Sequence, residues 1–566
     1  MGVKTNWYKE AVVYQIYPIS YQDSNNDGIG DIPGIISRLD YIKELGVTAI
    51  WFSPLYASPW KDYGYDISDY RAIHPAFGTM EDFDRLVAEC HKRGLKVIMD
   101  MVLNHTSDQH PWFKAALEDK NSLYRDYYII RKGRHRGTKL LPPTNWTSSF
   151  TGPAWQRIGD TDEFYLHLFA PQQPDLNWES PVVRHEIIQI LKFWLDKGVD
   201  GFRFDVFNMY SKSYPLRDDR RKFEFQKGTQ YFVDGPRMHE FLSEMNEKAL
   251  SLYDTYTVGE SYIPDPEHAF RYIQEESGEL DSIFDFEHLN ADNMLKFFPR
   301  PFDLKRFKKG LFYPQIMYHG KGWNTLVLEN HDCVRSVSRF GINTSRFRYE
   351  AATFLATITF MGWGTPFIYQ GEEIGMTNSP FSGMDELMDP VSHFVYDMMT
   401  KQFHMPHGLA FRLILHGARD HARTPMQWTS GANAGFTGTA APWQSINPNY
   451  TEINVEADLA SERSIYRYYQ KLLAVRRSEK VALLGEVMEY DPDNTKIVTY
   501  SRNYEGQRLL ITGNFSGKPA AAHIPDDFEI RDLEVIISNY DKTVVGREMM
   551  LRPYEAIVLR EHYNKV

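Results

Sequence analysis

The sequence predicts an α/β protein: a closed parallel (β/α)₈ barrel with a small inserted domain after its third strand and a C-terminal all-β sandwich domain. Three observations support this prediction. Eight apolar segments alternate with helix-like segments along most of the chain. A stretch of roughly ninety residues interrupts this alternation after the third segment, and short alternating strands follow residue 480.

The eight apolar segments are near-continuous hydrophobic runs, as expected for strands that are covered on both faces of a parallel sheet. They span residues 12–18, 49–54, 96–102, 200–207, 256–261, 282–288, 324–330 and 365–373. Between them, residues 35–45 and 80–93 place apolar side chains at three- and four-residue spacing, and Gly46 and Gly94 stand where helices end. Eight such strand–helix units predict a TIM barrel.

Two stretches depart from the barrel pattern. The segment after the third strand is rich in aromatic, Pro, Gly and basic residues as far as residue 173, and a loop of that length is rarely structureless. We therefore expect the barrel in residues 1–104 and 174–480 and an inserted domain in residues 105–173. After residue 480 the hydrophobic period changes to two, which predicts a separate sandwich in residues 481–566.

Composition excludes several classes of partner. The chain has 566 residues and a net charge of −12, which argues against nucleic acid and anionic membrane as partners. Its N-terminus lacks the apolar core and cleavage site of a secretory signal. With only Cys90 and Cys333 there is no disulfide framework, so we expect a cytoplasmic protein.

One uncharged stretch, residues 351–371, is long enough to suggest a membrane span. Gly362, Gly364 and Pro366 interrupt it, so a buried helix followed by a buried strand is the better interpretation. The expected state is a monomer or a weak homo-oligomer.

Four of the predicted strands end in a carboxylate or beside a histidine. The segments are DMVLNH (100–105), GFRFD (201–205), VGE (258–260) and ENHD (329–332). Folding alone gives an apolar strand no reason to end on an unpaired acid, because burying one is unfavourable. The carboxyl ends of barrel strands are where reactive groups are displayed, so the acids predict chemistry on a polar, uncharged substrate.

Asp205 and Glu260 form the pair expected of a glycosidase, which uses one carboxyl to donate a proton and one to attack or stabilise the anomeric carbon. Arg203 lies two residues before Asp205 and shares its face of the strand, so we expect it to keep Asp205 ionised. Glu260 follows an apolar run, and desolvation there would raise its pKa and keep it protonated. Structural ion pairs at the barrel rim are the alternative for either acid taken alone.

These four segments resemble the conserved regions of glycoside hydrolase family 13, the α-amylase family, and QPDLNW (173–178) resembles its fifth region. Within the family the chain is most similar to the oligo-1,6-glucosidase/α-glucosidase group. Further matching stretches are DYGYDISDY (62–70), YLHLF (165–169), GTPFIYQGEEIGMTN (364–378) and HARTPMQW (421–428). The resemblance covers nearly the whole chain, from residue 12 to residue 559.

The resemblance implies a role for each matching position. Asp205 would be the nucleophile, Glu260 the acid/base and Asp332 the residue that stabilises the transition state. His105 and His331 would hold hydroxyls of the same sugar ring, and Asp62 with Arg423 would close the pocket around the terminal glucose. The implied substrate-binding residues are Asp62, Tyr65, His105, Phe150, Arg203, His331 and Arg423. The implied enzyme is a retaining exo-acting α-glucosidase.

The linkage and the leaving group are less defined by the sequence. Val206, directly after the nucleophile, resembles the α-1,6-cleaving type, although trehalose-6-phosphate hydrolases share it. Glu329, Cys333 and Val334 depart from the family pattern beside Asp332, where we expect them to face the leaving group. The alternatives are a sucrose- or isomaltulose-active enzyme, an enzyme for a plant or lipid glucoside, a trehalose-6-phosphate hydrolase, a sucrose isomerase or other transglucosylase, and, remotely, a non-catalytic binding homologue.

A separate metal site is predicted in DSNNDGIGD (23–31). Asp23, Asn25 and Asp27 place oxygen ligands at alternate positions before a glycine, which is how a loop wraps Ca²⁺, although an ordinary Asx turn is the alternative. Family relatives would add the backbone oxygen of Ile29 and the side chain of Asp31. We expect a structural Ca²⁺, with Mg²⁺ as the alternative ion.

The one dense basic cluster is RKGRHRGTK (131–139), in the expected inserted domain. A solvated loop is the ordinary interpretation of such a run. The alternative is an anion subsite for a phosphorylated sugar.

Overall fold

The computed structural model describes residues 4–221, 227–262, 266–342, 344–541 and 543–562. At its centre lies an eight-stranded parallel sheet that confirms the predicted barrel. In chain order its strands are β1 (Val13–Ile16), β2 (Ala49–Phe52), β5 (Lys96–Met101), β11 (Gly201–Phe204), β12 (Tyr256–Glu260), β13 (Ser282–Phe284), β16 (Thr325–Val327) and β17 (Thr365–Tyr369). Each falls within one of the eight predicted segments.

The sheet closes on itself. Its strand order runs β13-β12-β11-β5-β2-β1-β17-β16, so β13 and β16 stand at the two ends of the series. The hydroxyl of Thr325 on β16 donates to the carbonyl of Ile283 on β13 over 2.9 Å, which joins those ends. Almost every residue of these strands is buried, as expected for a barrel that is filled inside and covered by helices outside.

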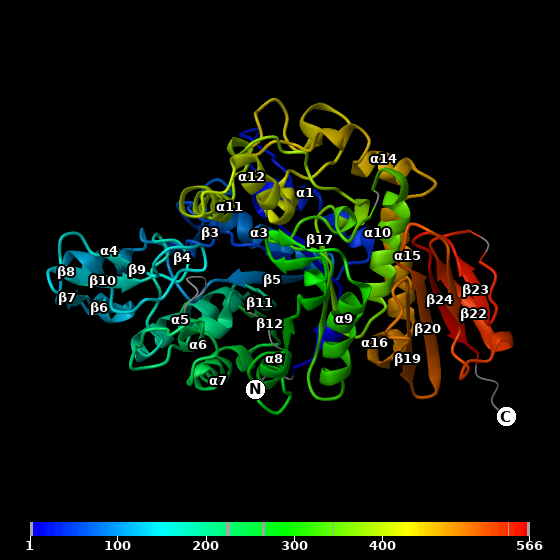
Figure 1. Cartoon of the computed structure of the whole chain (residues 1–566), viewed down its shortest axis with the longest axis horizontal. Helices are drawn as coiled ribbons and strands as arrows, with labels where there is room; N and C mark the ends of the chain where they lie inside the picture. Colours follow the sequence, from blue (N-terminus) through cyan, green and yellow to red (C-terminus); the bar gives the residue numbers. More distant parts are fainter. Residues whose placement is uncertain (1–3, 222–226, 263–265, 343, 542, 563–566) are drawn as a thin grey trace.

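Helices follow the strands and cover the barrel (Figure 1). They include α1 (Ile32–Ser37), α2 (Leu39–Leu45), α3 (Met80–Lys92), α5 (Pro181–Asp196), α7 (Met238–Lys248), α8 (Pro266–Tyr272), α9 (Leu304–Tyr318), α10 (Thr344–Phe360) and α15 (Ile465–Ser478). The capping box between Thr79 and Asp82 starts α3, and left-handed Gly46 ends α2 where the sequence predicted a stop.

The uncharged stretch 351–371 is the buried part of α10 followed by β17, as predicted. Among the residues that the structure describes, no helix combines the length and the apolar character that crossing a bilayer requires.

The first part of the stretch between β5 and β11, up to β10, forms a small unit at the left of Figure 1. It contains α4 (Pro111–Glu118), a three-stranded antiparallel sheet and a hairpin. The sheet has the order β6 (Ile130–Lys132), β10 (Glu163–Leu166) and β9 (Trp155–Arg157), and the hairpin pairs β7 (Arg134–Arg136) with β8 (Lys139–Leu141). Its buried apolar residues, Trp146, Trp155 and Leu166 among them, belong to a core that it shares with the segment after β17.

The C-terminal part is antiparallel β structure, seen at the right of Figure 1. Its larger sheet contains β18 (Glu486–Tyr490), β19 (Ile497–Tyr504), β20 (Gln507–Asn514), β24 (Ala556–Glu561) and β22 (Leu533–Ser538). Its smaller sheet pairs β21 (Ala520–His523) with β23 (Glu548–Leu551). Residues 548–561 form two strands, β23 and β24, because Pro553 and left-handed Tyr554 break the strand between them.

The segment between β17 and α15 is mostly irregular and lies over the carboxyl ends of the barrel strands. It contains α11 (Pro390–Asp397), α12 (His407–Gly417) and the short helix α13 (Asp420–Arg423). Two short strands, β14 (Asn293–Leu295) and β15 (Phe298–Pro299), face it from the chain that follows β13. These elements supply much of one cavity.

Candidate active site

A cavity of about 450 Å³ opens at the carboxyl ends of the barrel strands. Seven of the predicted site residues line it: Asp62, Tyr65, His105, Phe150, Asp205, Glu260 and Asp332. Asp205, Glu260 and Asp332 come from three different strand ends, so closure of the barrel brings together side chains that are far apart in sequence. The geometry therefore confirms that they share one cavity.

Arg203 lies behind this cavity and joins the acids. Its Nη1 atom lies 2.7 Å from Oδ1 of Asp100 and 2.6 Å from Oδ1 of Asp205. Its Nη2 atom donates to Oε2 of Glu260. The register explains the arrangement, because Arg203 on β11 pairs with Asp100 on β5 and Val258 on β12.

One guanidinium does not keep three buried carboxyls fully ionised. Burial raises the pKa of Asp205 to about 7 and that of Glu260 to about 7, even though Arg203 opposes both shifts. The expectation for Glu260 agrees with this result. Arg203 lowers the pKa of Asp205, in the expected direction, but burial and the neighbouring acid Asp100 raise it.

Asp332 has the opposite electrostatic environment. Burial opposes its ionisation, but the neighbouring cations, Arg419 and Arg423 among them, lower its pKa well below the usual range. Arg423 Nη2 donates to Asp332 Oδ1 over 2.8 Å, and Arg419 Nη1 donates to the same oxygen over 3.1 Å. Asp332 is therefore the acid of the three that stays ionised.

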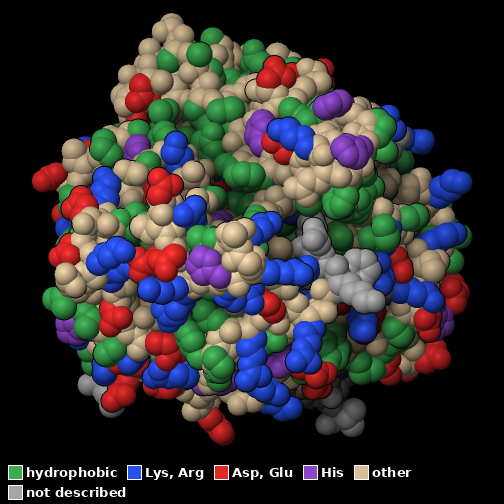
Figure 2. All heavy atoms as spheres, turned by 60° about the vertical axis from the view of Figure 1, so that its left-hand side comes forward, with side chains coloured by type: hydrophobic (Ala, Val, Ile, Leu, Met, Phe, Trp, Pro, Cys, Tyr) green, Lys and Arg blue, Asp and Glu red, His purple; other side chains and the backbone are tan. Residues whose placement is uncertain are grey.

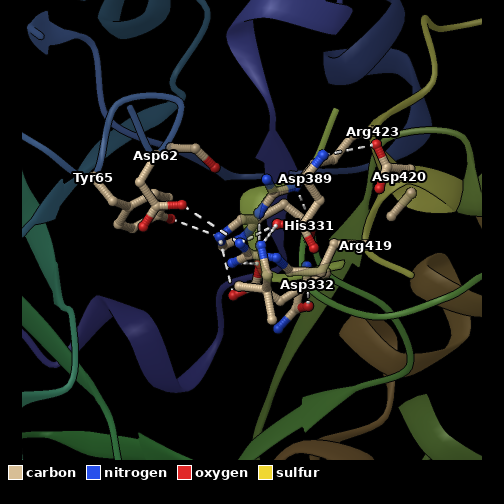
Figure 3. Close-up of polar contacts among 12 residues, drawn as sticks. Asp62, Tyr65, His331, Asp332, Asp389, Arg419, Asp420 and Arg423 are labelled. Atoms are coloured by element: carbon tan, nitrogen blue, oxygen red, sulfur yellow. Dashed lines mark hydrogen bonds and ion pairs between the residues drawn. The ribbon is translucent and has the colours of Figure 1, made fainter. Parts of the chain in front are cut away.

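Asp62 and Arg423 were expected to close the pocket together, but of the two only Asp62 is among the described residues that line the cavity. The partner of Asp62 among the described residues is Arg419, whose Nη2 lies 3.4 Å from Asp62 Oδ1 and also donates to buried Asp389 (Figure 3). Arg423 instead donates from Nε to the carbonyl of His331 over 3.0 Å. Arg419 and Arg423 lie one helical turn apart around α13. Both are arginines of the same short segment, so the sequence alone did not show which of them faces Asp62.

The two histidines are neutral, because burial lowers the pKa of His331 to about 3 and that of His105 to about 4. The Gln15 amide lies 2.8 Å from His331 Nδ1, so Nε2 carries the ring proton toward the Tyr65 hydroxyl, 2.7 Å away. The Tyr65 hydroxyl donates to Asp100 Oδ2 over 3.0 Å. A continuous chain of hydrogen bonds thus fixes the floor of the cavity.

Among the described residues, Arg203, His331 and Arg423 do not line the cavity. They hold the side chains that do, and their contact with a sugar stays a prediction. Of the departures from the family pattern, Cys333 and Val334 line the cavity as expected. Glu329 does not, because it turns inward to bond Arg335 over 3.1 Å and the backbone and hydroxyl of Ser336 over 2.7 Å.

Sequence reasoning missed Arg419, Asp389, Gln173 and Lys296. Gln173 donates to Asp62 Oδ2 over 3.0 Å and lies 3.2 Å from His105 Nε2. It begins the QPDLNW segment, so that motif gave a usable signal. Asp389 and Lys296 lie outside every matching stretch, and nothing in their local sequence marked them.

The loop 23–31 curls around its own oxygen atoms. Oδ1 of Asp23, Asn25 and Asp27 accepts the backbone N–H of Asn25, Asp27 and Ile29, respectively, over 2.9–3.0 Å. Asp31 Oδ2 accepts the N–H of Ser24 over 3.0 Å. Among the described residues no three His, Cys, Asp or Glu side chains form a metal-binding cluster. The atoms of the loop that could bind a metal are all oxygens, from Asp and Asn side chains and the backbone, and oxygen ligands fit a hard cation.

The basic run 131–139 lies on β6, β7 and β8, and none of its residues is among those that line the cavity. Arg134 pairs with Asp218 through both of its terminal nitrogens, at 2.7 and 3.0 Å. The prediction of a solvated face fits this arrangement better than an anion subsite does.

Comparisons with known proteins agree with this geometry. The family model "Alpha amylase, catalytic domain" matches residues 15–485, and "Maltogenic Amylase, C-terminal domain" matches residues 489–558. The chain is 47% identical to an oligo-1,6-glucosidase of Parageobacillus thermoglucosidasius over 560 residues, 98% of this chain and 99% of that one.

Two solved structures are similar over their whole length. The trehalose-6-phosphate hydrolase of Bacillus licheniformis superposes with a TM-score of 0.92 at 43% identity, covering 98% of this chain and 100% of that one. The trehalulose synthase of Pseudomonas mesoacidophila MX-45 superposes with a TM-score of 0.94 at 38% identity, covering 99% and 100%.

Proposed function

Because the chain belongs to the α-amylase family of glycoside hydrolases, we propose that it is a retaining, exo-acting α-glucosidase that releases terminal α-1,6-linked glucose from short oligosaccharides. The single observation that supports this best is the bridging of Asp205 and Glu260 by one guanidinium. The bridge brings the two carboxyls close to one another, and retaining enzymes hold this pair closer together than inverting enzymes do.

In this proposal Asp205 attacks the anomeric carbon and Glu260 gives its proton to the departing glycosidic oxygen. Water then hydrolyses the glucosyl-enzyme, with Glu260 acting as the base. Asp332, which stays ionised, stabilises the positive charge that develops on the sugar ring in both steps. The raised pKa of Glu260 supports the first of its roles, because a general acid must hold its proton near neutral pH.

The contact between Asp62 and Arg419 supports exo action. Both residues line the cavity, and Arg419 also holds buried Asp389, so this end is closed by a rigid ion-pair network. A cavity closed in this way admits one terminal sugar and excludes the middle of a chain. Relatives named oligo-1,6-glucosidase at 43–47% identity, and Val206 in the lining, support the α-1,6 linkage.

The proposal is tested with wild-type enzyme, Asp205→Asn and the control Asp69→Asn, an exposed acid on β4 (Asp69–Ile73). Each is assayed on isomaltose, maltose, sucrose and trehalose 6-phosphate. We expect isomaltose to be the best substrate, α-glucose to be the first product by NMR, and Asp205→Asn to lose at least about 10³-fold in kcat. Full activity in Asp205→Asn, or β-glucose as first product, would refute the mechanism.

The panel also decides among the rivals. A new disaccharide from sucrose would indicate an isomerase, and a preference for trehalose 6-phosphate would identify a phosphosugar hydrolase, the activity named for one structural relative. Retention of all three acids in one cavity argues against a non-catalytic binding homologue.

For the loop 23–31 we propose a structural Ca²⁺, with Mg²⁺ as the alternative. Asp23, Asn25, Asp27, the backbone oxygen of Ile29 and Asp31 would hold it. The loop packs against residues 436–443, where Asp23 N donates to Phe436 O and Trp443 N donates to Gly28 O, each over 3.0 Å. An ion there would fasten this contact and take no part in the reaction. We further propose a cytoplasmic location.

A further inference from the structure

The side of the cavity that would receive the leaving group has an unusual lining for a sugar-binding site. Glu260, the proposed proton donor, pairs in register with Phe284 of β13, so the chain that follows β13 lies beside it. That chain contributes Phe286, Leu289, Leu295 and Phe298 to the cavity, and α11 contributes Val391 and Val395. The wall next to the departing oxygen is therefore mostly aromatic and aliphatic.

The polar residues on this wall are largely engaged elsewhere. Arg339 donates to Asp292 and to the carbonyl of Leu289. His416 Nε2 lies 2.6 Å from the Asn293 amide. Asn290 and Lys296 also line the cavity with exposed side chains, and the charged groups that act on Lys296 are Arg419, Asp332 and Asp389 of the closed end. The closed end, by contrast, presents Asp62, His105, Asp332 and Arg419.

This asymmetry has an energetic consequence. A second sugar carries several hydroxyls, and each one that is buried without a hydrogen-bond partner is penalised. An alkyl or aryl group gains free energy on the same wall by removing apolar surface from water. The leaving group is a primary alcohol both for an α-1,6-linked sugar and for a primary alkyl glucoside. The reaction at the anomeric carbon is therefore the same for both substrates.

We propose that this wall, formed by Phe286, Leu289, Leu295, Phe298, Val391 and Val395, is a binding site for an apolar alkyl or aryl aglycone. The inference rests on the proposed α-glucosidase function and names a substrate class for it. The apolar surface extends outward from the cavity, because Leu295 is 58% exposed. Figure 2 shows hydrophobic side chains gathered around a hollow in one face of the molecule.

The test is a series of methyl, propyl, pentyl and hexyl α-glucosides, used below their micelle concentrations. Their leaving alcohols differ little in acidity, so kcat/KM reports contact with the aglycone. Each methylene that the wall buries should raise kcat/KM by about two- to fourfold, giving at least about a tenfold rise from methyl to hexyl. Hexyl glucoside should also match or exceed isomaltose.

Two variants locate the effect. Leu295→Gln changes a lining residue, whereas Met294→Gln changes its equally exposed neighbour, which is not among the described lining residues because successive side chains of β14 point to opposite faces. Leu295→Gln should reduce the rise in kcat/KM from methyl to hexyl glucoside at least threefold. Met294→Gln should leave this rise unchanged. Val391→Thr, which adds a hydroxyl at nearly constant volume, provides a second test on the facing helix α11.

The outcomes separate the two proposals. A flat series in an enzyme that hydrolyses isomaltose well would overturn the aglycone site and leave the proposed function intact. A steep series that neither Leu295→Gln nor Val391→Thr alters would overturn the assignment of the wall. Failure to release glucose from any α-glucoside, isomaltose included, would overturn the proposed function and this inference with it.

Discussion

The Nη2 atom of Arg419 lies 3.4 Å from Oδ1 of Asp62, and this contact closes one end of the cavity. The same arginine donates to Asp332 and to Asp389, which is wholly buried. Arg419 therefore links the residue that would receive the terminal glucose to the acid that would stabilise the transition state. Its planar group makes these contacts together, which the point charge of a lysine does not.

Arg419→Lys should lower kcat/KM for isomaltose by about 10²-fold, because small displacements of positioning groups have effects of that size. Arg419→Gln should also lower the free energy of unfolding by about 3–5 kcal/mol, since it leaves Asp389 buried without its cation. Steady-state kinetics and urea unfolding measure the two effects. The control is Arg412→Lys, at an exposed position on α12. Unchanged kinetics in Arg419→Lys would show that the ion-pair network does not position the substrate.

Arg203 provides a second test, because it contacts three carboxyls at once. In Arg203→Lys the single ammonium should keep at most two of these contacts, so kcat should fall by about 10²-fold or more while KM changes less. A fall confined to KM would contradict a role in positioning Asp205 and Glu260. Arg85→Lys, at an exposed position on α3 that pairs with Asp82, is the matched control.

The barrel and its three acids could be predicted from sequence because both depend on local patterns. Buried parallel strands are continuous apolar runs, and an acid at the end of such a run is conspicuous. Closure of the sheet then brings Asp205, Glu260 and Asp332 together without further information. The family resemblance, and not the strand pattern, placed His105 and Tyr65 in the site, and both line the cavity.

The remainder depends on how distant segments pack. The partner of Asp62 could not be assigned correctly, since Arg419 and Arg423 are one turn apart and only the fold decides which one faces the cavity. Asp389 and Lys296 come from irregular segments with no period to place them. The inward turn of Glu329 toward Arg335 likewise depends on a buried partner that strand patterning does not identify.

The pH dependence of kcat/KM should be bell-shaped and narrow. The active form needs Asp205 ionised and Glu260 protonated, and burial raises the pKa of each to about 7. As pH falls, Asp205 gains a proton and activity is lost; as pH rises, Glu260 loses its proton and activity is lost again. Because the two groups interact, the limbs describe the pair, and the maximum should lie near neutral pH.

Glu260→Gln identifies the alkaline limb. With p-nitrophenyl α-glucoside, whose leaving group needs little protonation, this variant should keep measurable activity and lose only the fall at high pH. With isomaltose it should lose about 10²–10⁴-fold. A wild-type profile that stays flat to about pH 9 would mean that Glu260 is not the group whose proton limits the reaction.

Val206 should influence the linkage that is cleaved. It lines the cavity directly after Asp205, and its φ of 36° is uncommon for a β-branched residue. Val206→Ala removes two methyl groups and relieves crowding at the backbone, so it should admit other linkage geometries. We expect the ratio of kcat/KM for isomaltose over maltose to fall by about tenfold, within the range that a small change in pocket shape can produce. If this ratio of kcat/KM values is unchanged, other lining residues and not Val206 determine which linkage is cleaved.

Binding of Ca²⁺ to the loop 23–31 should raise thermal stability without changing kcat. The proposed ion fastens this loop to residues 436–443, so removing it with a chelator should lower Tm, and adding Ca²⁺ back should restore it in proportion to the logarithm of its concentration. Asp27→Asn is the informative variant, because Asn can still accept the N–H of Ile29 through Oδ1 but lacks the charge that attracts the ion. In chelator the Tm of Asp27→Asn should equal that of the wild type, and added Ca²⁺ should raise it by less. The Tm of the exposed control Asp69→Asn should respond to Ca²⁺ as the wild type does. A Tm that chelator and Ca²⁺ leave unchanged would show that the loop is held by its Asx turns alone.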